Sequence, residues 1–294
     1  MNTVKKIRLG NFELFFLRNG SFWLDGGGCF GIVPKIIWRK LVYADELNRV
    51  KLDSNSLLIR TDEHNILIDP GLGNKYSEKQ KKIFRIENKP SIDQSLSELG
   101  ITSDDIDIVI ATHLHFDHIG AFTKYDNQSD IQGDRNIVPT FPNAIHYIQK
   151  GEWQEAISPN ERTKGTYFIT NYMPLMDAGL VKLIEGNQEI CPGISVEITG
   201  GHTKYHQIVF IKSQANIAVY LGDIMPTANH IKVAYTTGFD LYPVEVMRKK
   251  RELYQRAIDE NWIVCLDHDS RNCAGYIRQT PDAKNYTFQP YEFT

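Results

Sequence analysis

The sequence predicts an α/β protein, because segments with strand patterns alternate with segments with helix patterns along the chain. Short apolar runs bounded by polar or glycine-containing turns recur in both halves of the 294 residues. Capped helical patterns lie between these runs. No proline-, glycine- or serine-rich linker divides the chain, so we expect residues 1–294 to form a single domain.

The first half predicts a hairpin, a helix and a buried strand in that order. Residues 56–61 and 66–69 are β-prone runs on either side of a polar turn. A helix is expected over 91–99, since a serine caps it, apolar residues recur at helical spacing, and a glycine follows it. Residues 106–112 are mostly apolar and predict a buried strand that ends at His113.

The second half predicts three strands, one long helix and a final strand. Pro243 is well placed as the first residue of the helix, which continues to about Asn261. The expected strands are residues 194–199, 208–212, 217–221 and 262–266.

A histidine or aspartate follows each of four expected strands. These residues are His113, His202, Asp223 and His268. Loops at strand ends often carry functional side chains that a rigid scaffold aims at one place. We therefore expect the four side chains to converge on one site.

Composition and charge exclude several classes of protein. Apolar residues make up 41% and charged residues 23%, which excludes a disordered or collagen-like chain. A net charge of −3 gives no reason to expect a nucleic-acid partner. No apolar run approaches the ~20 residues that cross a bilayer, so we expect no membrane partner. The chain shows no signal-peptide pattern and no CxxC pair, which favours a reduced, cytoplasmic protein.

The main chemical signal is the segment THLHFDHIG at 112–120, which holds three histidines and one aspartate. His113 and His115 are two residues apart, so in an extended segment they point to the same side. Imidazole and carboxylate groups suit zinc, manganese, iron and cobalt. A solvated loop would not explain why further ligand-type residues follow later strands. We therefore interpret the segment as part of a metal site.

The motif HLHFDH resembles the HxHxDH signature of the metallo-β-lactamase superfamily. Four other segments are similar to the family in order and spacing, over roughly residues 50–270: NILIDPGLGN, GGHTKYHQ, YLGD and CLDHD. The segments DGGGCFGIVPKIIW, FPNA and GDIMPT are most similar to its quorum-quenching lactonase branch, with methyl parathion hydrolase as a more distant relative. The resemblance implies an αβ/βα four-layer sandwich, in which two mixed sheets face each other and helices lie outside.

The resemblance also implies a dinuclear centre with seven ligands. The implied ligands are His113, His115 and His202 for one ion, Asp117, His118 and His268 for the second, and Asp223 as the bridge between them. Asp69 is implied as the partner that hydrogen-bonds a ligand histidine and fixes its ring. Zinc is the expected metal, with manganese, iron or cobalt as alternatives.

Such a centre implies a metal-dependent hydrolase that attacks a small ester with a metal-bridging hydroxide, while Asp117 passes on the proton. The favoured substrate is a lactone of the acyl-homoserine type, because the apolar residues 30–38 suit an acyl chain. A phosphotriesterase or other phosphoesterase is the alternative, followed by a non-hydrolytic metal-binding sensor. Pro226 stands where the well-described lactonases carry a carbonyl-polarising tyrosine.

Four residues are candidates for substrate contacts: Phe30, Phe116, Met225 and His230. For His230, a solvated loop position is the alternative to the mouth of the pocket. Residues 20–45 are expected to form a lid, a contact in a homodimer, or internal core. The remaining predictions are structural: buried or supporting histidines at His146 and His206, a flexible turn at 26–28, and a solvated basic helix surface at 248–251.

Overall fold

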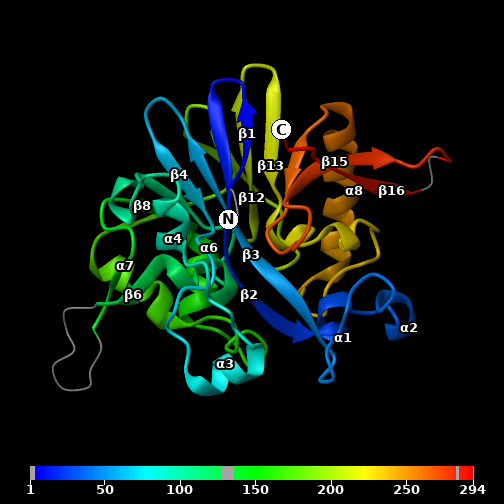
Figure 1. Cartoon of the computed structure of the whole chain (residues 1–294), viewed down its shortest axis with the longest axis horizontal. Coiled ribbons are helices and arrows are strands. Elements are labelled where there is room, and N and C mark those ends of the chain that lie inside the picture. Colours follow the sequence, from blue (N-terminus) through cyan, green and yellow to red (C-terminus); the bar gives the residue numbers. More distant parts are fainter. Residues whose placement is uncertain (1–3, 127–135, 283–284, 294) are drawn as a thin grey trace. The chain divides into compact units, whose positions relative to one another are not determined.

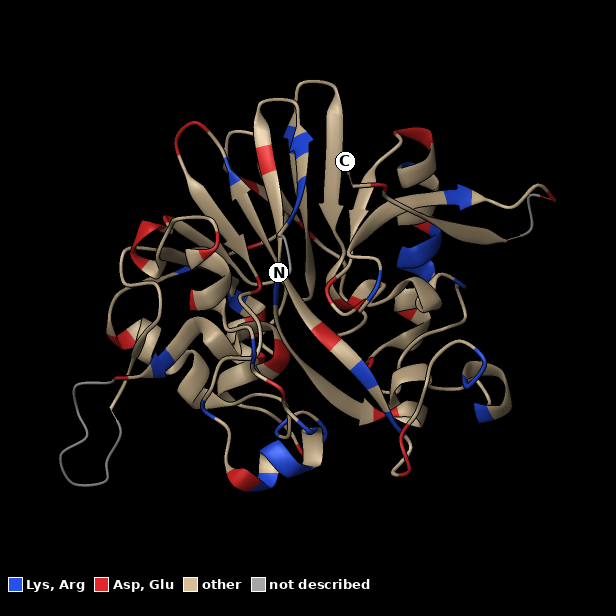
Figure 2. Cartoon of the chain, in the orientation of Figure 1, with Lys and Arg blue, Asp and Glu red and all other residues tan. Residues whose placement is uncertain are grey.

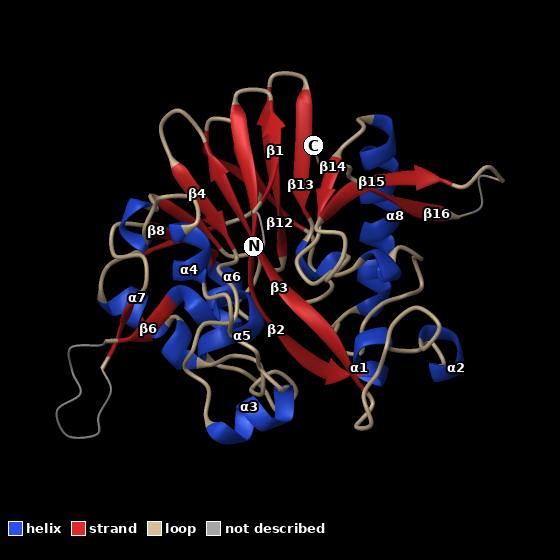
Figure 3. Cartoon of the chain, viewed as in Figure 1, coloured by secondary structure: helices blue, strands red, loops and turns tan. Residues whose placement is uncertain are grey.

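The structure is a computed structural model that describes residues 4–126, 136–282 and 285–293. The chain forms two compact units (Figure 1). Unit 1 comprises Met1–Lys6, Phe12–Ser21 and Ser54–Glu185, and unit 2 comprises Ile7–Asn11, Phe22–Asp53 and Gly186–Thr294. Both units contain strands and helices, as the sequence predicts for an α/β protein (Figure 3).

A mixed seven-stranded sheet has the strand order β1-β2-β3-β4-β5-β8-β9. The predicted hairpin is the antiparallel pair β3 and β4, and strands β4, β5, β8 and β9 then pair in parallel. The residues of β1, β2 and β3 are divided between the two units. The bounds are β1 Lys5–Leu9, β2 Phe12–Asp25, β3 Arg49–Arg60, β4 Asn65–Ile68, β5 Ile108–Ile110, β8 Ile145–Gln149 and β9 Val181–Ile184, with β6 Thr123–Tyr125 and β7 Ile137–Pro139 forming a separate pair.

The helices of unit 1 lie between these strands along the chain. The predicted helix is α4, and its N-cap Ser91 forms a capping box with Gln94. It ends at Ser97, two residues before the predicted end. Its apolar face joins a buried cluster that includes Ile92, Leu96 and Val109. The helix bounds are α3 Glu78–Phe84, α4 Ile92–Ser97, α5 Phe116–Ile119, α6 Lys150–Ile157 and α7 Met173–Asp177, with short 3₁₀ turns η1 Ser103–Asp105, η2 Gly120–Phe122 and η3 Ile169–Asn171.

Unit 2 contains a second mixed seven-stranded sheet, in which the strands β10 to β16 are neighbours in sequence order. Only β13 and β14 pair in parallel, and helix α8 forms the long connection between them. The three strands and the long helix predicted before residue 261 are all present. The bounds are β10 Gln188–Cys191, β11 Ile194–Ile198, β12 Gln207–Ser213, β13 Asn216–Tyr220, β14 Ile263–Cys265, β15 Ala274–Gln279, β16 Tyr286–Pro290, α1 Gly26–Phe30, α2 Lys35–Trp38 and α8 Pro243–Asp259, with 3₁₀ turns η4 Gly222–Ile224 and η5 Ala228–His230.

The glycine run at 26–28 is not a flexible turn, so that prediction is wrong. It begins helix α1, because the Asp25 carboxylate caps the helix by accepting a hydrogen bond from the Gly28 amide at 3.0 Å. A Cβ on Gly26 would meet the Trp38 ring at 2.4 Å. Glycine is therefore needed here for close packing.

The basic run on α8 is also only partly a solvated surface. Arg248 and Arg251 are exposed, but Lys250 is buried with 1% of its surface exposed. Elsewhere on the described part of the chain, basic and acidic side chains are interspersed on the elements of both units (Figure 2). Among the described residues, no helix combines the length and the apolar character that a membrane span requires.

Candidate metal centre

In unit 1, the His-rich motif leaves strand β5 and enters the short helix α5. His113 and His115 lie in the connecting segment, whereas Asp117 and His118 lie in the first turn of α5. All four side chains are buried. The His113 ring centroid lies 4.5 Å from that of His115 and 4.1 Å from that of His118. The motif therefore gathers three imidazoles within one short turn of chain.

Asp69 holds this segment in place from the end of β4. One carboxylate oxygen accepts a hydrogen bond from the Thr112 amide at 2.8 Å, and the other accepts from the Thr112 hydroxyl at 2.6 Å. The second oxygen also lies 2.9 Å from His118 Nδ1. Strand β5 ends at Ile110, whereas the sequence predicts a strand that continues to residue 112. The strand is shorter because the Thr112 amide bonds to Asp69.

Two glycines let the loop after β4 approach the end of α5 closely. A Cβ on Gly120 would lie 1.9 Å from the Leu72 carbonyl oxygen, and a Cβ on Gly73 would lie 2.3 Å from the Gly120 carbonyl oxygen. The half-buried Lys75 donates from its ammonium to the Gly120 carbonyl at 2.6 Å and to the Thr123 carbonyl. These contacts fix where α5 ends, and so where the histidines of the motif lie.

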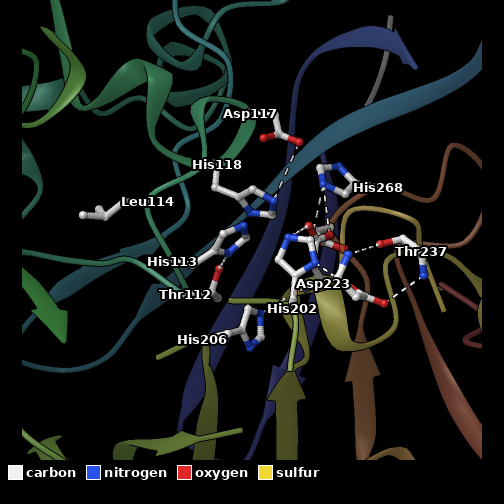
Figure 4. Close-up of polar contacts among 12 residues, drawn as sticks. Thr112, His113, Leu114, Asp117, His118, His202, His206, Asp223, Thr237 and His268 are labelled. Carbon is white, nitrogen blue, oxygen red and sulfur yellow. Dashed lines mark hydrogen bonds and ion pairs between the residues drawn. The ribbon is translucent and has the colours of Figure 1, made fainter. Parts of the chain in front are cut away.

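In unit 2, three predicted ligands follow three strands. His202 lies after β11, Asp223 lies in η4 after β13, and His268 lies after β14. Asp223 Oδ2 is 2.9 Å from His202 Nε2, and Asp223 Oδ1 is 3.4 Å from His268 Nε2 (Figure 4). The two imidazoles of unit 2 therefore face one carboxylate.

Four of the histidines share one hydrogen-bonding pattern, in which Nδ1 is held by a partner within the same unit. The pairs are His113 with the Thr112 hydroxyl at 3.0 Å, His118 with Asp69 at 2.9 Å, His202 with Asp240 at 2.8 Å, and His268 with the Asp53 carbonyl at 2.8 Å. Each partner accepts from the ring, since Thr112 already donates its hydroxyl proton to Asp69. Nδ1 therefore carries a proton in each ring, so Nε2 is the nitrogen that a metal would take once its own proton is lost, as in ligand histidines of metal sites.

The buried ring of His202 lies between two carboxylates, those of Asp223 and Asp240. Burial opposes protonation, but attraction to Asp223 and Asp240 is stronger and raises the pKa of His202 to about 10. Asp240 is itself held, because its other oxygen accepts a hydrogen bond from the Thr237 amide at 2.8 Å. Paired carboxylates around an imidazole create a place that attracts positive charge.

The sequence did not single out two carboxylates of unit 2. Asp267 is buried, and with Asp223 and His268 it offers potential ligand atoms that all lie within 4.8 Å of one another. Asp240 orients His202 from 38 residues further along the chain. Asp267 is adjacent to His268 and could have been suspected from that position, whereas Asp240 lies in an irregular segment without any motif.

His206 has a structural role in unit 2. Its Nε2 accepts a hydrogen bond from the Asp223 amide at 3.2 Å, and its Nδ1 lies 2.7 Å from the Thr199 hydroxyl. Both ring nitrogens are thus occupied, which confirms the structural interpretation. His146 is likewise buried in unit 1, where its ring packs edge-on against Phe122.

A cavity of about 340 Å³ lies within unit 2, and His268 forms part of its wall. Phe30 and His230 also line it, so His230 is not a solvated loop residue. Apolar and polar groups share the wall, which is typical of a site for a small molecule. The lining includes Trp23, Phe30, Leu41, Tyr43, Lys51, Asn229, His230, His268 and Arg271.

The other two candidates for substrate contact lie elsewhere. Met225 is fully buried in the core of unit 2, where the Tyr254 hydroxyl lies 3.0 Å from its sulfur. Phe116 is buried in unit 1 and stacks on Phe84 and Phe168. Met225 is therefore a core residue and has no surface with which to contact a substrate.

The segment 20–45 is divided between a buried and an exposed part. Phe30 and Trp38 stack with ring centroids 5.5 Å apart and are both buried, which matches internal core. Ile32 and Ile36 are exposed, with 81% and 71% of their surfaces accessible. The lid and the homodimer contact stay predictions.

The comparisons with solved structures support the fold. The chain is similar to a probable metal-dependent hydrolase from Staphylococcus aureus, with 33% identity, a TM-score of 0.86, and coverage of 98% of this chain and 100% of that chain. It is also similar in fold to AidC, a dizinc quorum-quenching lactonase solved with the product N-hexnoyl-L-homoserine, with 20% identity, a TM-score of 0.79, and coverage of 99% and 98%. The predicted fold class, with its two mixed sheets and helices, is confirmed.

A curated relative is the N-acyl homoserine lactonase of Bacillus thuringiensis, which is 25% identical over 174 residues. The match covers 56% of this chain and 60% of the relative, so the chain spans about three fifths of the relatives it matches. The family pattern described as the metallo-beta-lactamase superfamily matches residues 49–268, which include every predicted ligand. The chain therefore belongs to the metallo-β-lactamase superfamily.

Proposed function

We propose that the chain is a hydrolase that uses two divalent metal ions to open a lactone. Four of the proposed ligands belong to unit 1 and three belong to unit 2. The observation that carries the proposal is the hydrogen bond that four of the histidines make through Nδ1 to a partner in the same unit. That bond leaves Nε2 as the nitrogen available to a metal ion. The proposed ligands are His113, His115, Asp117, His118, His202, Asp223 and His268.

The donor set suits zinc, which we propose as the metal; AidC, a structural relative, is a dizinc protein. Two bound divalent ions would polarise the substrate carbonyl and lower the pKa of a water nucleophile to near ~7. Asp223 faces two histidines and carries two separate oxygens, which fits the role of a bridge. Asp69 and Asp240 fix the rings of His118 and His202.

Asp117 is the proposed proton carrier. Its Oδ2 lies 3.9 Å from His118 Nε2, so the carboxylate lies beside the imidazoles of the motif. The side chain is buried but is held at the first turn of a helix, which keeps its position fixed. A carboxylate there could take a proton from an attacking water and return it to the leaving alkoxide.

The cavity of unit 2 is proposed to hold the part of the substrate that does not react. It borders His268, and its wall combines aromatic rings with polar side chains. That combination suits an uncharged molecule with an apolar chain and an amide, as in an acyl-homoserine lactone. The relatives named as lactonases support this choice of substrate, and quorum quenching would follow from it.

A substrate panel tests the proposal. Zinc-loaded protein is assayed with acyl-homoserine lactones of several chain lengths, with aryl esters and with aryl phosphotriesters. We expect the highest kcat/KM on a lactone, loss of activity in Asp223→Ala, and normal activity in Asp259→Ala, whose side chain is exposed on α8. Failure to open any lactone, or full activity in Asp223→Ala, would contradict the proposal, and a preference for phosphotriesters would favour the phosphotriesterase alternative.

A further inference from the structure

Helix α8 carries a lysine whose charged end lies inside unit 2. Lys250 Nζ donates hydrogen bonds to the carbonyl oxygens of His230 at 2.8 Å and Tyr235 at 2.7 Å. A buried ammonium is costly unless its hydrogen bonds are satisfied. The two carbonyls therefore both stabilise Lys250 and are held by it, which ties the segment 230–235 to α8.

His230 ties the same segment to helix α1. Its Nε2 donates to the Cys29 carbonyl at 2.9 Å, and its Nδ1 accepts from the Thr227 hydroxyl at 2.8 Å. The ring also stacks on Phe30, with centroids 4.8 Å apart and planes inclined by 10°. In the His230 ring Nε2 carries the proton and Nδ1 accepts. This differs from the four histidines described above, in which Nδ1 carries a proton. His230 therefore connects two segments of unit 2, and its hydrogen bonds differ from those of the proposed metal ligands.

A backbone contact adds to this connection. The Gly238 amide donates to the Gly28 carbonyl at 2.7 Å. A Cβ on Gly31 would meet the Thr236 carbonyl oxygen at 2.7 Å, and Gly31 has a φ of +54°, so the chain is held close at a position that favours glycine. Segment 227–238 therefore contacts α1 and the glycine that follows it at several points.

These two segments form one side of the cavity that borders His268. Cys29 and Phe30 come from α1, whereas Thr227, Asn229 and His230 come from the other segment. Lys250 is not among the lining residues, and its ammonium donates to two backbone carbonyls of the segment. A change at Lys250 would reach the cavity only through the position of that wall.

We propose that Lys250 is a positioning residue that, together with His230 of the cavity wall, locks segment 227–238 between α8 and α1 and thereby sets the shape of the cavity and its choice among substrates. The part concerning substrates rests on the proposed function, since it assumes that the cavity receives the substrate. The part concerning the wall rests on contacts within unit 2 alone.

The first variant is Lys250→Met, which keeps an apolar stem of similar length and removes all donors. The matched control is Arg251→Met, which removes one positive charge from the next, exposed position of the same helix. Amide hydrogen exchange should become faster in 227–238 and 26–31 for Lys250→Met and stay unchanged for Arg251→Met. Metal content should be the same in both.

The kinetic measurement separates positioning from a general loss of structure. We expect Lys250→Met to raise KM for the preferred lactone about tenfold with kcat within about twofold, because only binding of the non-reacting part is weakened. The preference among acyl-chain lengths should flatten. His230→Leu should have the same effect, and His230→Gln, which keeps an amide donor toward Cys29, should restore part of the preference.

Several outcomes would overturn the inference. Folded variants with unchanged exchange in 227–238, or with lower kcat and unchanged KM on every lactone, would show that the pair does not position the wall. If Lys250→Met does not fold, hydrogen exchange and lactone kinetics of the two His230 variants test the inference instead. If the wild-type protein opens no lactone, the proposed function fails, while the exchange experiment still tests the wall.

Discussion

At the residue scale, the proposed centre involves the partners that hold four of its imidazoles as well as the imidazoles themselves. The motif HxHxDH holds four of the proposed ligands in a dense, recognisable pattern, and the resemblance to the family implies the other three. The sequence predicted Asp69 only through the resemblance, and it missed Asp240, since no local pattern marks an aspartate in an irregular segment. Partners of this kind are chosen by the fold, and a single sequence does not reveal them.

Asp240→Asn should weaken metal binding by about 10- to 100-fold without unfolding the protein. Asp240 accepts two hydrogen bonds, one from His202 Nδ1 and one from the Thr237 amide, on its two different oxygens. Asparagine offers one acceptor oxygen, so one of these donors would face an NH₂ group. Competition with a chromophoric zinc chelator measures the affinity, with Asp259→Asn as the exposed control, and equal affinities for the two variants would refute the role given to Asp240.

At the scale of single elements, the sequence predicted the presence of strands better than it predicted the residues at which they begin and end. The predicted run 106–112 contains β5, yet the strand has only the residues Ile108–Ile110, because Thr112 bonds to Asp69 instead of extending the ladder. The glycine run became α1 because an aspartate caps it and a tryptophan packs on it. The first outcome depends on a contact with a residue 43 positions away, and the second on a cap and a packing ring outside the run, neither of which periodicity reports.

Gly120→Ala should destabilise unit 1 by about 1–3 kcal/mol, because the added Cβ would overlap the Leu72 carbonyl and push α5 out of place. Gly165→Ala is the matched control, since a Cβ there meets no atom within 4 Å. Chemical denaturation of the metal-free proteins gives both values. A variant at 120 as stable as the one at 165 would show that the close approach of these loops is not required.

Lys250 should also make stability depend on pH. Burial lowers the pKa of Lys250 from 10.5 to about 7, so between these values the unfolded chain binds more protons than the folded one. The free energy of unfolding should therefore rise with pH across this range. Urea denaturation at pH values of about 7 and about 10 should show a smaller rise for Lys250→Met than for Arg251→Met. An equal rise in both variants would mean that Lys250 does not contribute.

At the scale of the whole molecule, the predicted fold class and the family are confirmed, and the assignment of all seven ligands to one centre stays a proposal. The family pattern spans ligands of both units, from residue 49 to residue 268. The sequence could predict this much because four of the proposed ligands follow expected strands and the order of segments is typical of the family. It named Phe30 and His230, which line the cavity, but not the rest of the wall, which includes residues of β2, β3, η5 and the loop after β14.

Metal removal should destabilise the protein in a concentration-dependent way. A ligand bound only by the folded state adds about 2.7 kcal/mol when its concentration is a hundred times its Kd. Chelator should therefore lower the Tm, and zinc should restore it in proportion to the logarithm of its concentration. A Tm that does not change with chelator would argue that the folded chain holds no structural or catalytic metal.

The most direct measurement is the metal content of protein purified without added metal, by elemental analysis of the wild type and of Asp223→Ala and His113→Ala. We expect two transition-metal ions per wild-type chain and fewer in each variant, because each substitution removes a proposed ligand. A wild-type chain without transition metal, or variants that keep the full content, would contradict this expectation.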